Sequence, residues 1–197
     1  RSQGYIGVLI DDLVTKESRE PYRMMTSRAE YRLLLRQDNA DQRLTKLGYE
    51  IGLISEERYE KLLEKERLIE EEIHRVERVN IGTSEEVQNL LKTYESTPLT
   101  SGTTLAELIR RPELSYEKLA PIDKNRKNLP EDVAQQVDIN IKYDGYIKRQ
   151  MRQVEQFKKL ENKKIPEDIN YDEIKSLRIE AKQKLNQIRP ASIGQAS

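Results

Sequence analysis

Five arginines gather in one short stretch of the chain, between Glu20 and Leu44. Two tyrosines are interleaved with them; the set comprises Arg23, Arg28, Arg32, Arg36 and Arg43, with Tyr22 and Tyr31. A guanidinium is a planar, permanently charged fork that suits phosphate and carboxylate, and a tyrosine ring can stack on a base. The pattern predicts a surface that binds an anion. The alternative is bracing, in which these arginines pair with the neighbouring acids Glu20, Glu30, Asp38 and Asp41.

A second candidate surface surrounds Gly145. The spacing of Lys142, Gly145, Arg149 and Arg152 places them on one helix face, and Tyr143 and Tyr146 flank the glycine. Glycine inside a helix costs roughly 1 kcal/mol relative to alanine, so its presence favours close approach by a backbone or a phosphate. The alternative is close packing of a second helix at Gly145, with the charges merely solvated.

The composition excludes several other kinds of chemistry. The 197 residues include no Cys and one His, which excludes disulfides, thiolate chemistry and the common Cys or His metal sites. No GxGxxG motif is present, and no apolar run approaches the roughly 18–20 residues of a membrane span. No signal peptide is visible either, so we expect a cytoplasmic protein.

Two long helices are expected to carry these surfaces. The first runs from about Ser55, a good N-cap, to Val79, and the second from Pro130 to about Leu160. The inner stripe of the second is expected at Val133, Val137, Ile141, Ile147, Met151 and Val154. Shorter helices are expected at residues 84–91, 104–110 and 171–188. The predicted fold class is mainly α, a helical bundle with a short irregular or partly extended N-terminal segment.

The arginine-rich stretch allows two local structures. Residues 31–36 form a short strand by length, or a helix, because Ser27 and Glu30 make a capping box. Nine residues separate Arg23 from Arg32, which on one continuous helix would place them roughly 180° apart. If both serve one site, the chain must bend just before Ser27.

Several stretches resemble one enzyme family. The arginine-rich stretch is similar to the motif EPYR-x-x-TSRAEYRL-x-LR-x-DNAD-x-RLT of the tRNA uridine 5-carboxymethylaminomethyl modification enzymes, the MnmG or GidA family. Further similar segments follow in order over essentially the whole chain: GYIGVLIDDLVTK (4–16), LIRRPELSYEKL (108–119), IKYDGYIKRQ (141–150), KKIPEDINYDEI (163–174) and RPASIGQAS (189–197).

The resemblance implies a role in tRNA modification. Members of the family are flavoproteins that use FAD, a reduced nicotinamide, NAD(P)H, and methylene-tetrahydrofolate, and act with an MnmE-type GTPase on the wobble uridine of tRNA. They bind the dinucleotide through an N-terminal region and form homodimers. This chain begins at Arg1 rather than Met. We therefore expect a C-terminal portion that binds tRNA and the partner, holds no FAD, NAD(P)H or metal itself, and is inactive alone.

The resemblance also implies roles for particular residues. Arg23 and Arg32 would lie near the substrate, next to the flavin domain, with Arg28 and Arg36 as secondary candidates. Glu180 would contact the partner or tRNA, or else simply pair with Lys184 on a helix surface.

Three segments are expected along the chain. Residues 1–50 would adjoin the flavin-binding domain, residues 51–190 would form the helical domain, and residues 191–197 would begin a small terminal helical unit, with Ser192 as N-cap. The rival interpretation is a purely structural helical domain that mediates homodimer or GTPase contacts without binding RNA.

Overall fold

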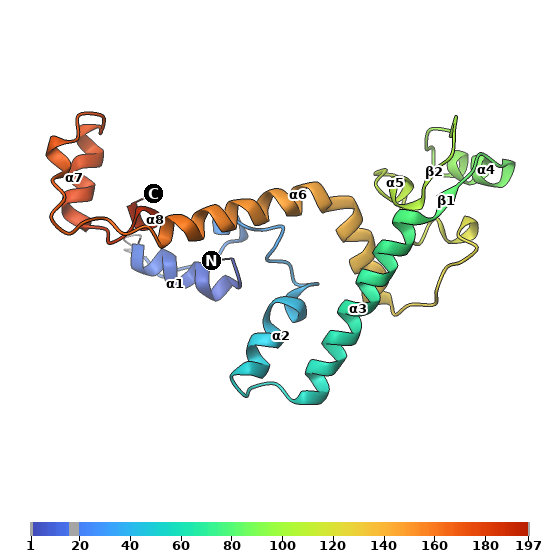
Figure 1. Ribbon diagram of the computed structural model, residues 1–197, viewed down its shortest axis with the longest axis horizontal. Coiled ribbons are helices and arrows are strands. Elements are labelled where there is room, and N and C mark those ends of the chain that lie inside the picture. Colours follow the sequence, from blue (N-terminus) through green and yellow to red (C-terminus); the bar gives the residue numbers. More distant parts are fainter. Residues whose placement is uncertain (1, 16–19, 197) are drawn as a thin grey trace. The chain divides into compact units, whose positions relative to one another are not determined.

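The computed structural model describes residues 2–15 and 20–196 and is mostly helical, which confirms the predicted fold class (Figure 1). Its α-helices are α1 (Tyr5–Thr15), α2 (Ala40–Glu50), α3 (Glu56–Arg78), α4 (Glu85–Thr93), α5 (Leu105–Ile109), α6 (Glu131–Glu161), α7 (Ile179–Ile188) and α8 (Ile193–Ala196). Short 3-10 turns cover Thr26–Arg28, Ala120–Ile122 and Tyr171–Glu173. None of the described helices is long and apolar enough to cross a bilayer.

The chain divides into two compact units, Arg1–Ile147 and Lys148–Ser197, and the division falls inside α6. The three segments expected from the sequence follow other boundaries and stay a prediction. Residues 191–196, expected to begin a separate unit, belong here to the same compact unit as α7.

The first unit has a large apolar core. Its buried side chains come from α3, α4, α5, the segment 114–122 and the first third of α6. A two-residue antiparallel ladder, β1 (Asn80–Ile81) with β2 (Thr103–Thr104), ties the end of α3 to the start of α5. The α2 and α3 helices form a helical hairpin, visible in Figure 1.

The two long helices lie where the sequence predicts them. Ser55 is the N-cap position of α3, although its side chain makes no capping hydrogen bond. Burial on α6 ends at Ile141, and Met151, expected on the inner stripe, is 51% exposed. The expected stripe is buried at Val133, Val137 and Ile141. The expectation for Met151 was wrong because periodicity alone does not show where a helix has a packed neighbour.

The N-terminal segment differs from both expected local structures. Residues 31–36 form neither strand nor helix but a turn, in which the Tyr31 carbonyl accepts from the Leu34 and Leu35 amides. Ser27 lies inside the 3-10 turn rather than at its N-cap, which is the extended residue Met25. The helices α1 and α2 on either side were not predicted. Val8, Ala29 and Leu35 bury together and hold the turn against α1.

The second unit has little core. Among its described residues, Tyr171 is the large apolar side chain that is buried. Backbone hydrogen bonds connect its segments. The Ile165 amide donates to the Ala191 carbonyl at 3.0 Å, and the Ile193 amide to the Lys163 carbonyl at 2.9 Å. Ser192 caps α8 as predicted, accepting from the Gln195 amide at 3.3 Å.

The expected single helix over residues 171–188 is wrong in its first half. The Asn170 side chain caps a short 3-10 turn by accepting from the Asp172 amide at 3.2 Å. Lys182 of α7 then donates to the Asp172 carbonyl at 2.7 Å, so this loop folds back on α7. Local side-chain capping therefore replaces the first two helical turns.

Candidate anion-binding site

The arginine-rich stretch separates into paired and unpaired guanidiniums. Arg28 lies 3.4 Å from the Asp12 carboxylate, and its guanidinium lies 5.3 Å from the ring centroid of Tyr22. The Tyr22 hydroxyl donates to the same Asp12 oxygen at 2.7 Å. Burial, then the hydrogen bond to Asp12, raises the pKa of Tyr22 above its ordinary value. Arg28 thus joins the stretch to buried Asp12 on α1.

Arg36 is paired as well. Its Nε donates to both Asp38 oxygens at 3.1 Å, and Gln136 of α6 donates to Asp38 Oδ2 at 2.7 Å. Burial raises the pKa of Asp38, but the hydrogen bonds from Arg36 and Gln136 outweigh it, so this pKa lies below its ordinary value. Bracing therefore describes Arg28 and Arg36, the two secondary candidates.

Arg23 and Arg32 are different. Both are exposed, and within residues 2–15 and 20–196 neither makes an ion pair or a side-chain hydrogen bond. The chain between them bends at the 3-10 turn Thr26–Arg28, as a shared site requires. Neither is buried against Glu20, Glu30 or Asp41, the pairing that would indicate bracing; Asp41 instead pairs with Lys65 at 2.8 Å.

The stripe along α6 is also mixed. Lys142 is partly buried and pairs with Asp138 at 3.2 Å. Arg149 and Arg152 are exposed without ion pairs among the described residues, and Arg152 makes one long contact to the Lys148 carbonyl, 3.4 Å. A Cβ built at Gly145 meets nothing within 4 Å in the described chain, so no helix packs closely there. Tyr143 and Tyr146 are both exposed.

Glu180 lies exposed in the first turn of α7. Among the described residues it forms no ion pair with Lys184, the pairing weighed as its structural role. Its side chain is therefore available to a partner.

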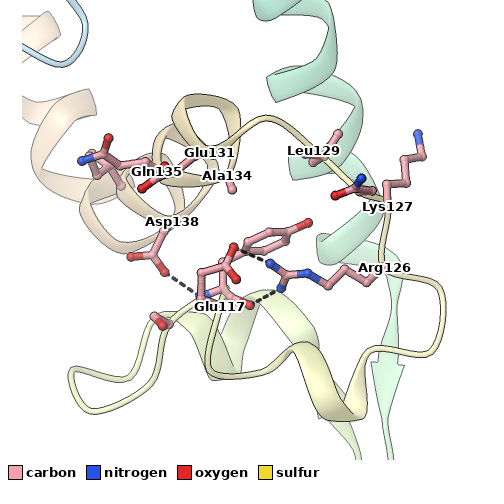
Figure 2. Close-up of a pocket in the computed structure, with 12 residues that line it drawn as sticks. Glu117, Arg126, Lys127, Leu129, Glu131, Ala134, Gln135 and Asp138 are labelled. Atoms are coloured by element: carbon pink, nitrogen blue, oxygen red, sulfur yellow. Dashed lines mark hydrogen bonds and ion pairs between the residues drawn. The ribbon is translucent and has the colours of Figure 1, made fainter.

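A groove of about 1010 Å³ in the first unit lies between segment 115–117, loop 126–129 and the start of α6 (Figure 2). Arg126 reaches Glu117 and donates to the Tyr116 carbonyl at 2.6 Å, and its guanidinium lies 4.1 Å from the Tyr116 ring centroid. Asp138 accepts from the Tyr116 amide at 2.7 Å. These groups satisfy one another, so the groove walls are braced.

Beneath this groove lies a buried charged network. The Tyr116 hydroxyl donates to Glu72 at 2.7 Å, and Arg75 contacts Glu72 through Nε at 2.9 and 3.0 Å. Arg75 also contacts both oxygens of Asp123. Glu72 is 0% exposed. Burial, then the hydrogen bond to Glu72, raises the pKa of Tyr116 well above its usual range. The network locks α3 to the segment 116–123.

The chemistry open to this arrangement is binding of an anion. No group of three or more His, Cys, Asp or Glu side chains that could hold a metal ion occurs among the described residues. Arg23, just before the 3-10 turn Thr26–Arg28, and Arg32, on the turn of residues 31–36, both provide forked donors. Two contributors escaped the sequence reasoning, Asp12 and Gln136. Gln136 had one signal, an amide beside the apolar stripe of Val133 and Val137.

Comparison with known proteins identifies relatives of the chain. A family model described as the tRNA modifying enzyme MnmG/GidA C-terminal helical domain matches residues 56–151. A second, the tRNA modifying enzyme MnmG/GidA C-terminal helical bundle, matches residues 153–197.

The chain also matches longer proteins along its full length. It is 72% identical, over 197 residues, to the tRNA uridine 5-carboxymethylaminomethyl modification enzyme MnmG of Lachnoclostridium phytofermentans, covering 100% of this chain and 31% of the relative. The MnmG of Caldicellulosiruptor saccharolyticus is 64% identical, with 100% and 32% covered. The structure of Aquifex aeolicus GidA in its form II crystal is 39% identical with a TM-score of 0.73, covering 99% of this chain and 30% of that one. The chain thus spans about a third of these proteins.

Proposed function

Because the chain belongs to the MnmG/GidA family of tRNA-modifying enzymes, we propose that it is the tRNA- and partner-binding portion of a flavin-dependent enzyme. The enzyme would install a carboxymethylaminomethyl-type group on the wobble uridine of tRNA, in the cytoplasm. The names of its relatives, tRNA uridine 5-carboxymethylaminomethyl modification enzymes, support the class of reaction.

The observation that carries the proposal is the contrast within the arginine-rich stretch. Arg28 and Arg36 are held by Asp12 and Asp38, whereas Arg23 and Arg32 are exposed and have no partner among the described residues. A guanidinium held out to solvent without an internal ion pair is available for a phosphate of tRNA. Arg23 and Arg32 therefore bind an anionic group of the substrate, and Arg28 and Arg36 shape the surface.

The second unit supplies further phosphate contacts. It carries 12 basic and 7 acidic residues, and Arg149 and Arg152 are exposed on its part of α6. Excess positive charge of this kind favours a polyanion. On the first unit's part of α6, Tyr143, Gly145 and Tyr146 are exposed and serve the partner or tRNA, as does Glu180 on α7.

FAD and NAD(P)H are bound outside this chain in the proposed enzyme. The sequence has no GxGxxG motif, which family members use to hold the pyrophosphate at a helix N-terminus. The walls of the groove beside Tyr116 carry three carboxylates, Glu117, Glu131 and Asp138, together with Arg126, which already pairs with Glu117, and Lys127. In this proposal the dinucleotide sites lie outside the chain, and the chain's own part is to bind tRNA.

The test is substitution in the full-length enzyme. Arg23→Lys and Arg32→Lys should each impair tRNA modification, because lysine cannot reproduce a bidentate contact. FAD content and Tm should stay near those of the parent. Arg78→Lys, at the exposed end of α3, is the matched control and should change nothing. A fall in Tm without loss of tRNA binding would show that Arg23 and Arg32 are braces.

One observation favours a second function. Apolar side chains are exposed on α1 and around the α2–α3 turn, including Ile6, Val14, Ile51 and Leu53. Such residues suit a protein interface, so the alternative is a structural domain for homodimer or MnmE-type GTPase contacts without RNA binding. In that case Ile51→Ser with Leu53→Ser would weaken association while tRNA affinity stayed unchanged.

A further inference from the structure

Gln136 is a polar side chain in the core of the first unit. It is 1% exposed and lies on α6 between the buried residues Val133 and Val137. A buried amide is costly unless it is hydrogen-bonded, so its partners show what it does. Its own carbonyl accepts from Asn140 at 2.8 Å, which is a local helix contact.

The side chain of Gln136 reaches a segment about 100 residues away in sequence. Its Nε2 donates to the Asp38 carboxylate at 2.7 Å and to the Asp38 carbonyl at 3.1 Å. Its Oε1 lies 3.5 Å from Nη2 of Arg36. One amide therefore contacts the main chain and both charged side chains of the Arg36–Asp38 pair.

The segment that Gln136 holds is the end of the turn formed by residues 31–36, which includes Arg32. Besides its Asp38 contacts, Arg36 donates to the Leu33 carbonyl, and Asn39 donates to the Leu34 carbonyl at 3.1 Å. Arg43 of α2 donates to the Arg36 carbonyl at 2.9 Å. The turn is thus closed on itself by side chains, and Gln136 attaches it to α6.

Arg32 lies on this turn between anchored positions. Tyr31 and Leu35 are each 2% exposed. The Arg32 side chain, in contrast, is exposed and makes no ion pair or hydrogen bond with the described residues. A bidentate guanidinium contact needs a backbone held in a defined orientation. The orientation of Arg32 consequently depends on the polar network that ends at Gln136.

We infer that Gln136 is a positioning residue for tRNA binding, which acts through Asp38 and Arg36 to hold the turn that presents Arg32 to a tRNA phosphate. The inference rests on the proposed function of Arg32. It assigns to the interior of α6 a role in substrate binding that its burial alone would not suggest.

The experiment uses the full-length enzyme and measures the Kd for its tRNA together with Tm. Gln136→Met keeps the volume but removes the amide, and it should weaken tRNA binding about tenfold, the effect of losing charge-assisted hydrogen bonds of ordinary strength. Gln135→Met, next to it but exposed, is the matched control and should leave Kd unchanged. If Gln136→Met does not accumulate as a folded protein, Gln136→Asn retains the amide on a shorter stem and should give a smaller loss.

A double-mutant cycle separates positioning from simple destabilisation. If Gln136 acts through Arg32, adding Gln136→Met or Gln136→Asn to Arg32→Gln should weaken binding no further than Arg32→Gln alone. Additive losses, or an unchanged Kd in the single Gln136 variant, would overturn the inference and leave the proposed function intact. An unchanged Kd in Arg32→Gln would instead refute the proposed function, and the inference with it.

Discussion

The two compact units of the chain carry net charges of opposite sign, and different interactions stabilise each unit internally. Arg1–Ile147 contains 23 basic and 28 acidic residues, and Lys148–Ser197 contains 12 basic and 7 acidic. The first unit closes over a large apolar core and a buried charged network. The second relies on backbone contacts and one buried tyrosine among its described residues. The neutral total charge is therefore the sum of an acidic unit with a large apolar core and a basic unit with few buried apolar side chains.

Removing one buried carboxylate should have the largest effect, and only on the first unit. Glu72→Ala leaves the Tyr116 hydroxyl without its acceptor and leaves Arg75 with Asp123 alone, so the free energy of unfolding should fall by about 3–5 kcal/mol. Chemical denaturation followed by circular dichroism measures it. Glu70→Ala, exposed on the same helix, is the control and should cost little. Equal losses for both variants would contradict a network-held first unit.

Overpacking one glycine should show how the second unit is held. A Cβ at Gly194 would lie 2.8 Å from Cα of Glu161, so Gly194→Ala should displace α8 at a cost of about 1–3 kcal/mol. Hydrogen exchange of the α8 amides reports that change.

Gly145→Ala is the matched control, because a Cβ there meets nothing within 4 Å in the described chain. It should stabilise α6 by about 1 kcal/mol, the usual difference between glycine and alanine in a helix. If Gly145→Ala instead destabilised the full-length enzyme, another segment would pack closely against Gly145. That result would support the packing alternative for this glycine.

Charge removal from the second unit should alter binding and leave stability unchanged. With Arg149→Gln and Arg152→Gln together, the slope of log affinity for tRNA against log salt should become shallower by roughly 0.7–0.9 for each lost phosphate contact. Affinity measured from 50 to 200 mM salt tests this. Lys142→Gln should change the slope less, because Lys142 already pairs with Asp138. An unchanged slope for the double variant would indicate that these charges are only solvated.

The smallest effect concerns pH and the first unit. The pKa of Asp38 lies below its ordinary value of 3.8, so its ionised form stabilises the folded state above that pH. The stabilisation, about 1 kcal/mol for a hydrogen bond of this kind, is lost as the pH falls through the lowered pKa. The stability advantage of the parent over Asp38→Asn should shrink in the same range. A pH-independent difference would show that the Asp38 contacts contribute nothing through its charge.

Local patterns in the sequence were enough for the long helices and the family. The spacing of apolar residues and the caps predicted α3 and α6 to within one or two residues, because both signals act within a few positions of the chain. The Ser192 cap of α8 is local for the same reason. The irregular stretch before α2 was misjudged because side chains distant in sequence, not its own periodicity, hold it.

Which arginines are available was decided by the tertiary structure. Arg23, Arg28, Arg32 and Arg36 are alike in type and neighbourhood, so their spacing could not separate braces from ligands. The separation depends on Asp12 and Gln136, which lie 16 and 100 residues from the arginines that they contact.

Burial of the charged network was decided in the same way. Glu72 is one of three consecutive glutamates on α3, and only packing against Tyr116, 44 residues away in sequence, makes it the buried one. The sequence by itself determined the helices, their caps and the family, because those signals are local or are carried by whole motifs. Ion pairs and buried amides depend on which distant segments the fold brings within about 3 Å, the range over which hydrogen bonds form, and that is a property of the tertiary structure alone.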